Sequence, residues 1–433
     1  MKISISNADG SVERVRVKRP VRNQIEWRPA ALDEFVPDDH RVRAVWAYVD
    51  AIDFTPLYQK FKAVEGRPGR DATDPKILMA LWMYATIESI GSARHLARLC
   101  ERDLIYMWIC GGVGVNHDML SAFRVEHVEF LDQLLTDTIA TLMHQNVVRL
   151  ETVAQDGMRV RAHAGGSSFR RQKTLEECRK AAAEQVKRLR EEAETQADPE
   201  ADNKRRRAAR ERAARGREER VQAALEHLAE LQEQKESRKK GTGKDARGST
   251  TDPEARTMKM ADGGYRPAYN VQFATDGDSR IIVSVDVVNN GSDGGQMTPM
   301  HDDVAERYGQ KPDEYMVDGG FATKEEITRM EQTGTKVYAP ISHGKRLSDD
   351  GRDPYDRRPG DSDEMYAFRQ RMKTDEAKEK YKKRPSIAEF PNAECRNRGL
   401  RQFLVRGLEK VRAVSLLHAI TFNLMRMQHL GVL

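Results

Sequence analysis

The sequence predicts a multidomain protein of mixed α+β or α/β class, with a helical N-terminal domain, a mixed-sheet domain and a charged helical insert. Apolar residues recur at helical spacing as far as about residue 146. Strand-like and helical runs then follow one another to the end of the chain, which is the order expected for a mixed sheet covered by helices. Residues 171–240 stand apart, because about half of them are charged and none is Phe, Trp or Tyr.

Length and composition favour a multidomain protein without a membrane span, a secretory signal or a zinc site. A chain of 433 residues predicts about three domains. No stretch approaches the ~20 apolar residues that span a bilayer, and residues 1–22 lack the apolar core of a secretory signal, so we expect a cytoplasmic protein with no membrane partner. The cysteines form no CxxC or zinc-ligand spacing, which favours reduced thiols at Cys100, Cys110, Cys178 and Cys395.

Residues 1–39 are predicted to be a polar lead-in, and residues 40–146 a helical domain. An Asp-Pro pair at Asp74 is a good helix start, since the carboxylate can cap the helix and proline suits its first position. Ser92 can cap a second helix, and residues 126–144 predict a third.

Arginines on these predicted helices leave two interpretations open. The region could be a DNA-binding domain, or a helical domain whose arginines are simply solvated. The arginines concerned are Arg94, Arg98, Arg102 and Arg124.

A second domain is predicted over residues 147–433, beginning with a β-branched strand at 147–154 that ends at the Asp156-Gly157 pair. A charged insert over residues 165–250 follows this strand. Its central block has 20 basic and 16 acidic residues between positions 171 and 240, too polar a composition for a core of its own.

The insert reads as two long charged helices that are interrupted near Asp198-Pro199. The run Arg205-Arg206-Arg207 could contact phosphates, or it could be a solvated face of a helix.

Alternating strand-like and helical sequence resumes after the insert. No Gly-rich dinucleotide fingerprint or phosphate loop follows the predicted strands. The sequence predicts hairpin strands at 269–275 and 281–288, helices at 298–308, 324–332, 365–384 and 411–430, and strands at 314–317 and 336–340, whereas residues 258–261 are not strand-like.

Two aspartates, Asp156 and Asp318, are predicted to lie just past strand ends. Carboxylates there could share a divalent metal, and a third carboxylate from a late helix would complete a two-metal site for phosphodiester chemistry. Oxygen ligands suit Mg²⁺ or Mn²⁺. Asp262, in a similar Asp-Gly-Gly sequence, and Asp286, inside a predicted strand, are weaker candidates.

The C-terminal region contains Tyr381, Arg384, Glu389 and Arg396, separated by two, four and six residues. This pattern resembles the tyrosine-arginine-glutamate-lysine/arginine signature of bacterial insertion-sequence transposases of the DDE class. Residues 398–412 look like the segment that follows this signature, and residues 39–124 resemble the helical InsH-type N-terminal domain of these enzymes.

The resemblance implies a ribonuclease H-like catalytic core in which Asp156, Asp318 and Glu389 are the catalytic, metal-holding triad. It implies Mg²⁺- or Mn²⁺-dependent cleavage of double-stranded DNA at element ends, followed by transfer of a 3′-hydroxyl into target DNA by a homodimer. Tyr381, Arg384 and Arg396 are then expected to bind DNA phosphates. A bacterial enzyme of this kind would associate with the nucleoid when bound to DNA.

Two alternatives to this function stay open on sequence. One is a host nuclease of the same fold, and the other is a DNA-binding relic without activity. Pro391 adds an alternative for the third ligand, because proline is poorly tolerated inside a helix. Either a helix starts near Phe390, or it breaks there, and Glu394 is the alternative third ligand to Glu389.

Overall fold

The computed structural model describes residues 3–6, 12–15, 31–61, 63, 71–195 and 201–433. The Asp198-Pro199 break lies outside the described residues, as do most of the predicted lead-in and most of residues 1–22, the region considered for a secretory signal. Within the lead-in, β1 (Ile3–Ser6) pairs antiparallel with β2 (Val12–Val15).

The N-terminal part is helical, as predicted. The caps foreseen at Asp74 and Ser92 are confirmed: Asp74 Oδ1 accepts from the backbone N–H of Lys76 at 2.9 Å, and Ser92 Oγ from that of His95 at 3.3 Å. The elements are η1 (Leu32–Phe35), α1 (Arg41–Asp50), α2 (Thr55–Tyr58), α3 (Pro75–Ile87), α4 (Ala93–Cys100), α5 (Leu104–Cys110), α6 (His117–Glu126) and α7 (Val128–His144).

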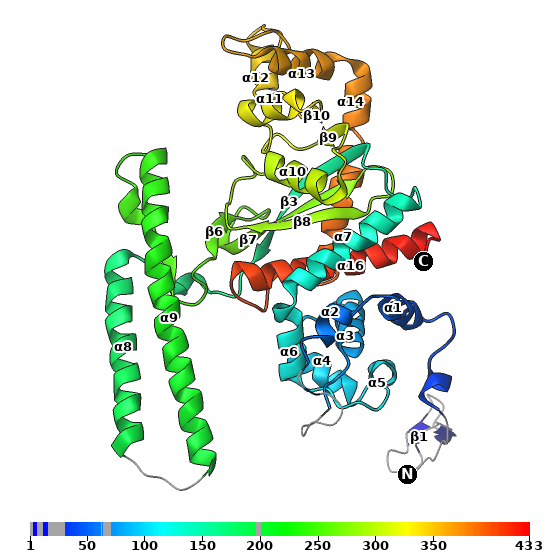
Figure 1. The fold of residues 1–433 in the computed structure, drawn as a ribbon, viewed down its shortest axis with the longest axis vertical. Coiled ribbons are helices and arrows are strands. Elements are labelled where there is room, and N and C mark those ends of the chain that lie inside the picture. The colour runs from blue at the N-terminus through cyan, green and yellow to red at the C-terminus, as the bar shows by residue number, and fades with distance from the viewer. Residues whose placement is uncertain (1–2, 7–11, 16–30, 62, 64–70, 196–200) are drawn as a thin grey trace.

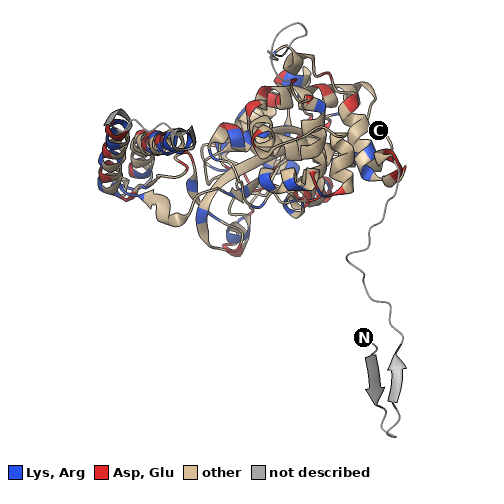
Figure 2. Ribbon diagram, turned by 90° about the horizontal axis from the view of Figure 1, so that it is seen from below, with Lys and Arg blue, Asp and Glu red and all other residues tan. Residues whose placement is uncertain are grey.

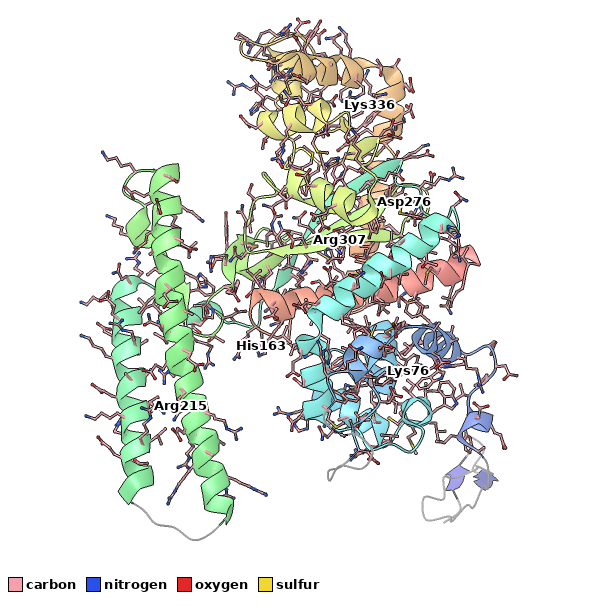
Figure 3. The ribbon with its side chains drawn as sticks, viewed as in Figure 1. Lys76, His163, Arg215, Asp276, Arg307 and Lys336 are labelled. Atoms are coloured by element: carbon pink, nitrogen blue, oxygen red, sulfur yellow. The ribbon has the colours of Figure 1, made fainter. Side chains whose placement is uncertain are left out.

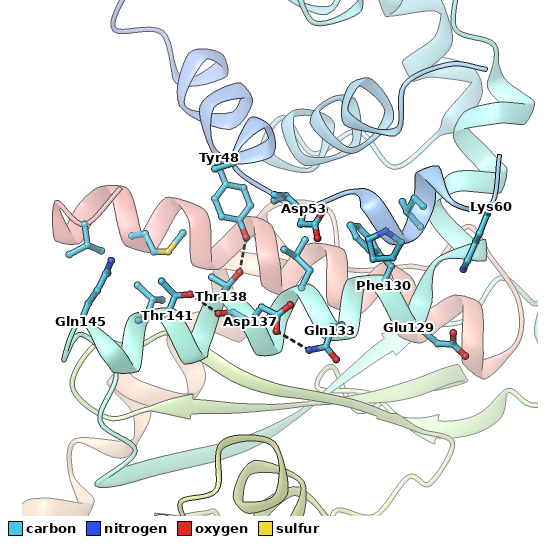
Figure 4. A pocket seen from close by; sticks show the side chains of 18 residues that line it. Tyr48, Asp53, Lys60, Glu129, Phe130, Gln133, Asp137, Thr138, Thr141 and Gln145 are labelled. Carbon is cyan, nitrogen blue, oxygen red and sulfur yellow. Dashed lines mark hydrogen bonds between the residues drawn. The ribbon is translucent and has the colours of Figure 1, made fainter. Parts of the chain in front are cut away.

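Helix α7 lies between the other N-terminal helices and the sheet (Figure 4). On the N-terminal side, Tyr48 Oη and Thr138 Oγ1 are 3.1 Å apart at a groove of about 750 Å³ between α1, α2 and α7. On the other side, Asp132 receives Arg307 and Arg412 at 3.0 and 3.1 Å. One helix therefore ties both parts of the chain together.

The central sheet has the order β10-β9-β3-β7-β6, with β8 also pairing β7. Strands β3, β9 and β10 are mutually parallel, whereas β7 is antiparallel to β3, β6 and β8. Strands β6 and β8 pair with successive stretches of the same long strand. The bounds are β3 (Thr152–Arg161), β6 (Arg256–Lys259), β7 (Tyr265–Asp276), β8 (Ile282–Val288), β9 (Glu314–Met316) and β10 (Lys336–Tyr338).

Three strand predictions need correction. The predicted strand at 147–154 starts only at Thr152, because Leu150 has a left-handed φ of 58° and its N–H bonds the buried Asp276 side chain. Strand β3 also continues through Asp156-Gly157, where a turn was expected, since β7 pairs with it as far as Arg161. Finally, residues 256–259 form β6, although this region was not expected to be strand-like.

Helices cover the sheet, and the sequence predicted most of them. The predicted helix over 365–384 is two helices, because Thr374 leaves helical geometry and caps the second one. The last helix is buried nearly all round rather than amphipathic. The helices are α10 (Met297–Tyr308), α11 (Lys324–Gln332), α12 (Gly344–Asp349), α13 (Asp363–Lys373), α14 (Asp375–Tyr381), α15 (Phe390–Asn397) and α16 (Leu408–Leu430).

The insert forms an antiparallel pair of long helices that stands apart from the sheet (Figures 1 and 2). Its helices are α8 (Gln172–Thr195) and α9 (Ala201–Arg238), joined to the core by β4 (Phe169–Arg170) and β5 (Gly248–Ser249). The expectation that this block has no core is partly wrong. A small separate cluster of Leu175, Ala224, Leu228 and Ala246 holds the two helices together at their base.

No helix in the described ranges combines the length and apolarity that a membrane span requires.

Candidate active site

Asp156 occupies the middle of β3, where its backbone pairs with Phe273 of β7. The sequence placed it past a strand end. Being in the strand, it is held more rigidly than a loop residue, and its side chain leaves the sheet toward the segment that contains Arg384 and Asn392.

A π-helical turn, Pro385–Glu389, leads into α15. Pro391 explains this wide turn, because it has no N–H and its ring would clash with the carbonyl four residues earlier in an α-helix. Such turns are rare and often occur at functional sites. The turn brings Arg384 and Glu389, five residues apart, to one face, with Arg384 Nη1 3.3 Å from Glu389 Oε1. The α-helical part, α15, starts at Phe390, as one alternative for Pro391 had it, but the π-helical turn before it already keeps the chain helical through Glu389.

Arg384 connects two of the three predicted carboxylates. Its Nη2 donates to Asp156 Oδ1 at 3.0 Å while its Nη1 reaches Glu389. The arginine is only 5% exposed, whereas the Glu389 side chain is 57% exposed. One buried guanidinium therefore holds an interior carboxylate beside a carboxylate that faces solvent.

Asn392 is a residue of this site that sequence reasoning missed. Its Nδ2 donates to Asp156 Oδ2 at 2.8 Å, and its side chain is 3% exposed. Asn392 Oδ1 has no hydrogen-bond partner among the described residues. The signal available in the sequence was its position three residues after Glu389, which places both at the same end of α15.

Asp318 lies just past the end of β9, as predicted, with Val317 between them, and its Oδ1 accepts from Gly320 N at 2.7 Å. Tyr381 lies beside it, because the Tyr381 hydroxyl donates to Val317 O at 3.1 Å. Burial raises the pKa of Tyr381; the Arg384 charge opposes this, while Asp318, Asp156 and Glu389 add to it. The tyrosine thus lies within the field of all three predicted triad carboxylates.

Burial raises the pKa of Asp156 to about 6. Arg384 and Asn392 lower it, and the charges of Asp318 and Glu389 raise it further. Neighbouring negative charges disfavour ionisation of a buried carboxyl and so raise its pKa. This is expected of carboxylates that lie close together without a bound cation.

The donor set at this position suits a hard divalent cation, because the converging side-chain oxygens come from carboxylates and Arg384 shows that they already surround a positive charge. No three His, Cys, Asp or Glu side chains in the described part of the chain are close enough together to form a complete metal cage. Mg²⁺ typically takes one or two carboxylates and completes its shell with water and substrate phosphates, so the residues fit that ion.

The remaining sequence candidates lie elsewhere. Arg396 is exposed, and no contact joins its side chain to the three carboxylates within the described residues. Glu394 pairs with Arg398 at 3.1 Å rather than with Arg384. Asp262 lies in the β6–β7 turn, paired with Arg266 at 2.7 Å, and Asp286 projects from β8.

The opposite face of β3 carries a second polar group. Asp293 accepts from Asn270, Gln272 and Arg159 at 2.6, 3.1 and 3.1 Å. A Cβ at Gly157 would lie 2.5 Å from Asp293 Oδ1, so this strand position needs glycine for the close approach. The Asp156-Gly157 pair is thus a predicted triad carboxylate next to a packing position within a strand, not a turn.

Three of the four arginines of the helical part are exposed, which both interpretations require, and the fourth fits neither. Arg94, Arg98 and Arg102 are exposed. Arg124 is neither solvated nor available to DNA: it is 7% exposed, lies 4.4 Å from the Trp82 ring centroid, and donates to Gly91 O at 2.6 Å.

A mixed sheet in this order, covered by helices, with one aspartate in β3 and another just past the end of the neighbouring β9, defines a ribonuclease H-like domain.

Comparison with known families agrees with this class. The model of a transposase domain (DUF772) matches residues 30–126, and that of a transposase DDE domain matches residues 237–424. The second match contains Asp318 and Glu389 but begins after Asp156 and most of the insert. No curated protein and no solved structure matches the chain. The chain belongs to the insertion-sequence transposases of the DDE class.

Proposed function

We propose that this transposase cleaves DNA at the ends of an insertion sequence and joins the resulting 3′-hydroxyl to target DNA, with Asp156, Asp318 and Glu389 as its catalytic triad. The observation that carries the proposal is the double contact of Arg384 with Asp156 and Glu389, next to Tyr381, whose hydroxyl donates to Val317 O, the carbonyl just before Asp318. Three segments far apart in the sequence thereby converge on one position.

The three carboxylates would hold Mg²⁺ or Mn²⁺ together with phosphate oxygens of bound DNA. A divalent metal bound there supplies activation of water or of a 3′-hydroxyl and stabilises charge on the phosphate. Arg384, which is only 5% exposed, is proposed to position Asp156 and Glu389, and its contact with a phosphate oxygen would require DNA to enter the site beside Glu389. Asn392 fixes the orientation of Asp156 by holding one of its oxygens.

The helical N-terminal part is proposed to recognise the element ends. Its exposed arginines Arg94, Arg98 and Arg102 lie on and just after α4, where they can contact DNA phosphates. Arg396, exposed near the end of α15, is a further phosphate contact in this proposal.

Charge-removing variants of the full chain test the triad. Asp156→Asn, Asp318→Asn and Glu389→Gln should each bind end DNA about as well as the parent and cleave it at least about a hundredfold more slowly, because the lost interaction acts on the reacting phosphate. Cleavage by the parent should stop in EDTA and return with Mg²⁺ or Mn²⁺.

Matched controls use carboxylates outside the site. Asp262→Asn, Asp286→Asn and Glu394→Gln should retain cleavage within a few-fold of the parent. Full cleavage by Glu389→Gln together with loss in Glu394→Gln would move the third ligand to Glu394. Strand transfer by the parent of a pre-cleaved end into a plasmid separates a transposase from a host nuclease or an inactive relic.

A further inference from the structure

The α8–α9 pair, here called the arm, has its positive charge concentrated at the free end. Residues 205–217 of α9 contain seven arginines and one acidic residue, Glu211. Residues 218–236 of the same helix contain six glutamates against Arg220 and Lys235. The sign of the charge therefore reverses along one helix, which the nearly balanced total for the insert conceals.

Most arginines of this basic stretch are exposed, although Arg215 also lines a groove with residues of α8. Ala214 and Val221 are buried against α8, whereas Arg205, Arg210, Arg212 and Arg217 are exposed. At about 1.5 Å per residue, the stretch is about 20 Å long. Figure 3 shows side chains of both arm helices extending into open space, with Arg215 labelled on this stretch.

Between residues 187 and 217, eleven basic residues stand against seven acidic residues, so the free end of the arm keeps a net positive charge. Arg190 lies 4.0 Å from Glu211, and Arg215 pairs with that same glutamate. Among the described residues, the four exposed arginines Arg205, Arg210, Arg212 and Arg217 have no ion pair.

We propose that the free end of the arm binds the phosphate backbone of double-stranded DNA without sequence preference. Arginine suits this role, because its planar guanidinium matches phosphate oxygens and is weakly hydrated. Ala208, Ala209 and Ala213 are exposed between the arginines, so the helix surface allows close approach of a phosphate backbone. This inference rests on the proposed function, in which the protein handles duplex DNA.

Other partners fit this surface less well. The insert has no aromatic side chain between residues 171 and 240, so it lacks the stacking platforms of single-strand binders. No large apolar side chain is exposed on the described parts of α8 and α9, which disfavours a coiled-coil contact with a second copy. Two such basic ends would also repel each other.

The test replaces the four exposed, unpaired arginines by glutamine in the full chain: Arg205→Gln, Arg210→Gln, Arg212→Gln and Arg217→Gln. A matched control removes four positive charges from the base of the arm through Lys173→Gln, Arg179→Gln, Lys180→Gln and Lys240→Gln, all exposed positions. Both variants lose the same net charge, so a difference between them reports position alone.

Binding of a random-sequence 40-base-pair duplex is measured by fluorescence anisotropy over a range of salt concentrations. The free-end variant should bind at least about tenfold more weakly at 100 mM salt, and its plot of log affinity against log salt should be shallower by up to about 4. The base variant should stay within about twofold of the parent. This measurement does not require cleavage, so failure of the proposed chemistry would leave its result interpretable.

Equal affinity and equal salt dependence of the free-end variant and the parent would overturn the proposal. An equal loss in the base variant would overturn it too, because total charge rather than the free end would then explain binding. Sedimentation of all three proteins tests the remaining possible partner, a second copy of the chain. If the free-end variant changed from dimer to monomer without weaker DNA binding, the proposal would be overturned and the arm would be assigned to contact between copies.

Discussion

At the scale of single residues, the site depends on how the two oxygens of Asp156 are divided. Arg384 holds Oδ1 and Asn392 holds Oδ2, and both partners are almost fully buried. Residues that hold a metal-binding carboxylate in place commonly affect metal affinity or activity by ten- to a hundredfold. Substitution of Asn392 is therefore as useful a test of the site as substitution of the predicted triad.

Asn392→Ala should lower cleavage by about tenfold or more and raise the Mg²⁺ concentration needed for half-maximal activity, because Asp156 loses the donor that orients it. End-DNA binding should remain unchanged. The control is Asn397→Ala, since Asn397 is exposed at the end of the same helix. Equal Mg²⁺ requirements in the two variants would refute a positioning role for Asn392.

His418 of α16 should make stability depend on pH. Burial, with Arg124 and Arg398, lowers its pKa to about 4, so the folded state favours the neutral ring. An unfolded histidine titrates near 6.5. Its contribution to the free energy of unfolding is therefore complete above about pH 6.5 and is lost as pH falls toward 4, by on the order of 1–3 kcal/mol.

Urea unfolding of parent and His418→Leu at several pH values between 7.5 and 4.5 measures this contribution. The variant should show a flatter decline than the parent over that range. The same substitution at exposed His95 should preserve the decline of the parent. A decline in His418→Leu as steep as that of the parent would rule out this histidine as the cause.

At the scale of elements, strand β3 has a polar cluster on each of its two faces. One face presents Asp156 to the π-helical turn, and the other accepts Asp293 against Gly157. The π-helical turn similarly results from a local defect, Pro391, that widens the helix and brings Glu389 back toward Arg384. Both devices position the site by backbone geometry.

Gly157→Ala should destabilise the protein by about 1–3 kcal/mol, because the added Cβ would meet three polar atoms within 3 Å in a bonded network. Gly319→Ala, in the matching Asp-Gly pair, meets nothing within 4 Å and should change stability little. Chemical denaturation of both variants measures the difference. Equal stabilities would show that the network around Asp293 yields at little cost.

At the scale of the whole molecule, α16 joins the two main parts of the chain. It packs against α3, α6 and α7 on one side and β8 on the other. The helical part and the sheet consequently share one hydrophobic cluster, whereas the arm has a small cluster of its own. The helical part and the sheet should unfold together, with the arm as a separate unit.

Leu416→Ala removes a fully buried side chain from α16 and should cost about 2–5 kcal/mol in a single transition. Replacing residues 171–247 by a short Gly-Ser loop should leave the melting temperature of the remaining protein within a few degrees of the parent. Arg170 and Gly248 are paired neighbours, so a short loop can join them. A large fall in melting temperature on removal of the arm would contradict this independence.

The sequence by itself determined the class of the fold, the helix caps at Asp74 and Ser92, the helical character of the insert and the family. These depend on local signals, such as capping residues and apolar periodicity, or on motifs that survive without knowledge of the fold. The triad was also predicted from the sequence, and it stays a prediction that the variants above would test.

Tertiary structure alone decided how the residues of the site meet. Pairing with β7 overrode the turn signal at Asp156-Gly157, as pairing partners far along the chain are invisible to local patterns. Burial of Asn392 and Arg124 likewise follows from packing between distant segments. A sequence lists these residue types, but only the fold determines which of them face one another, because those contacts join positions hundreds of residues apart.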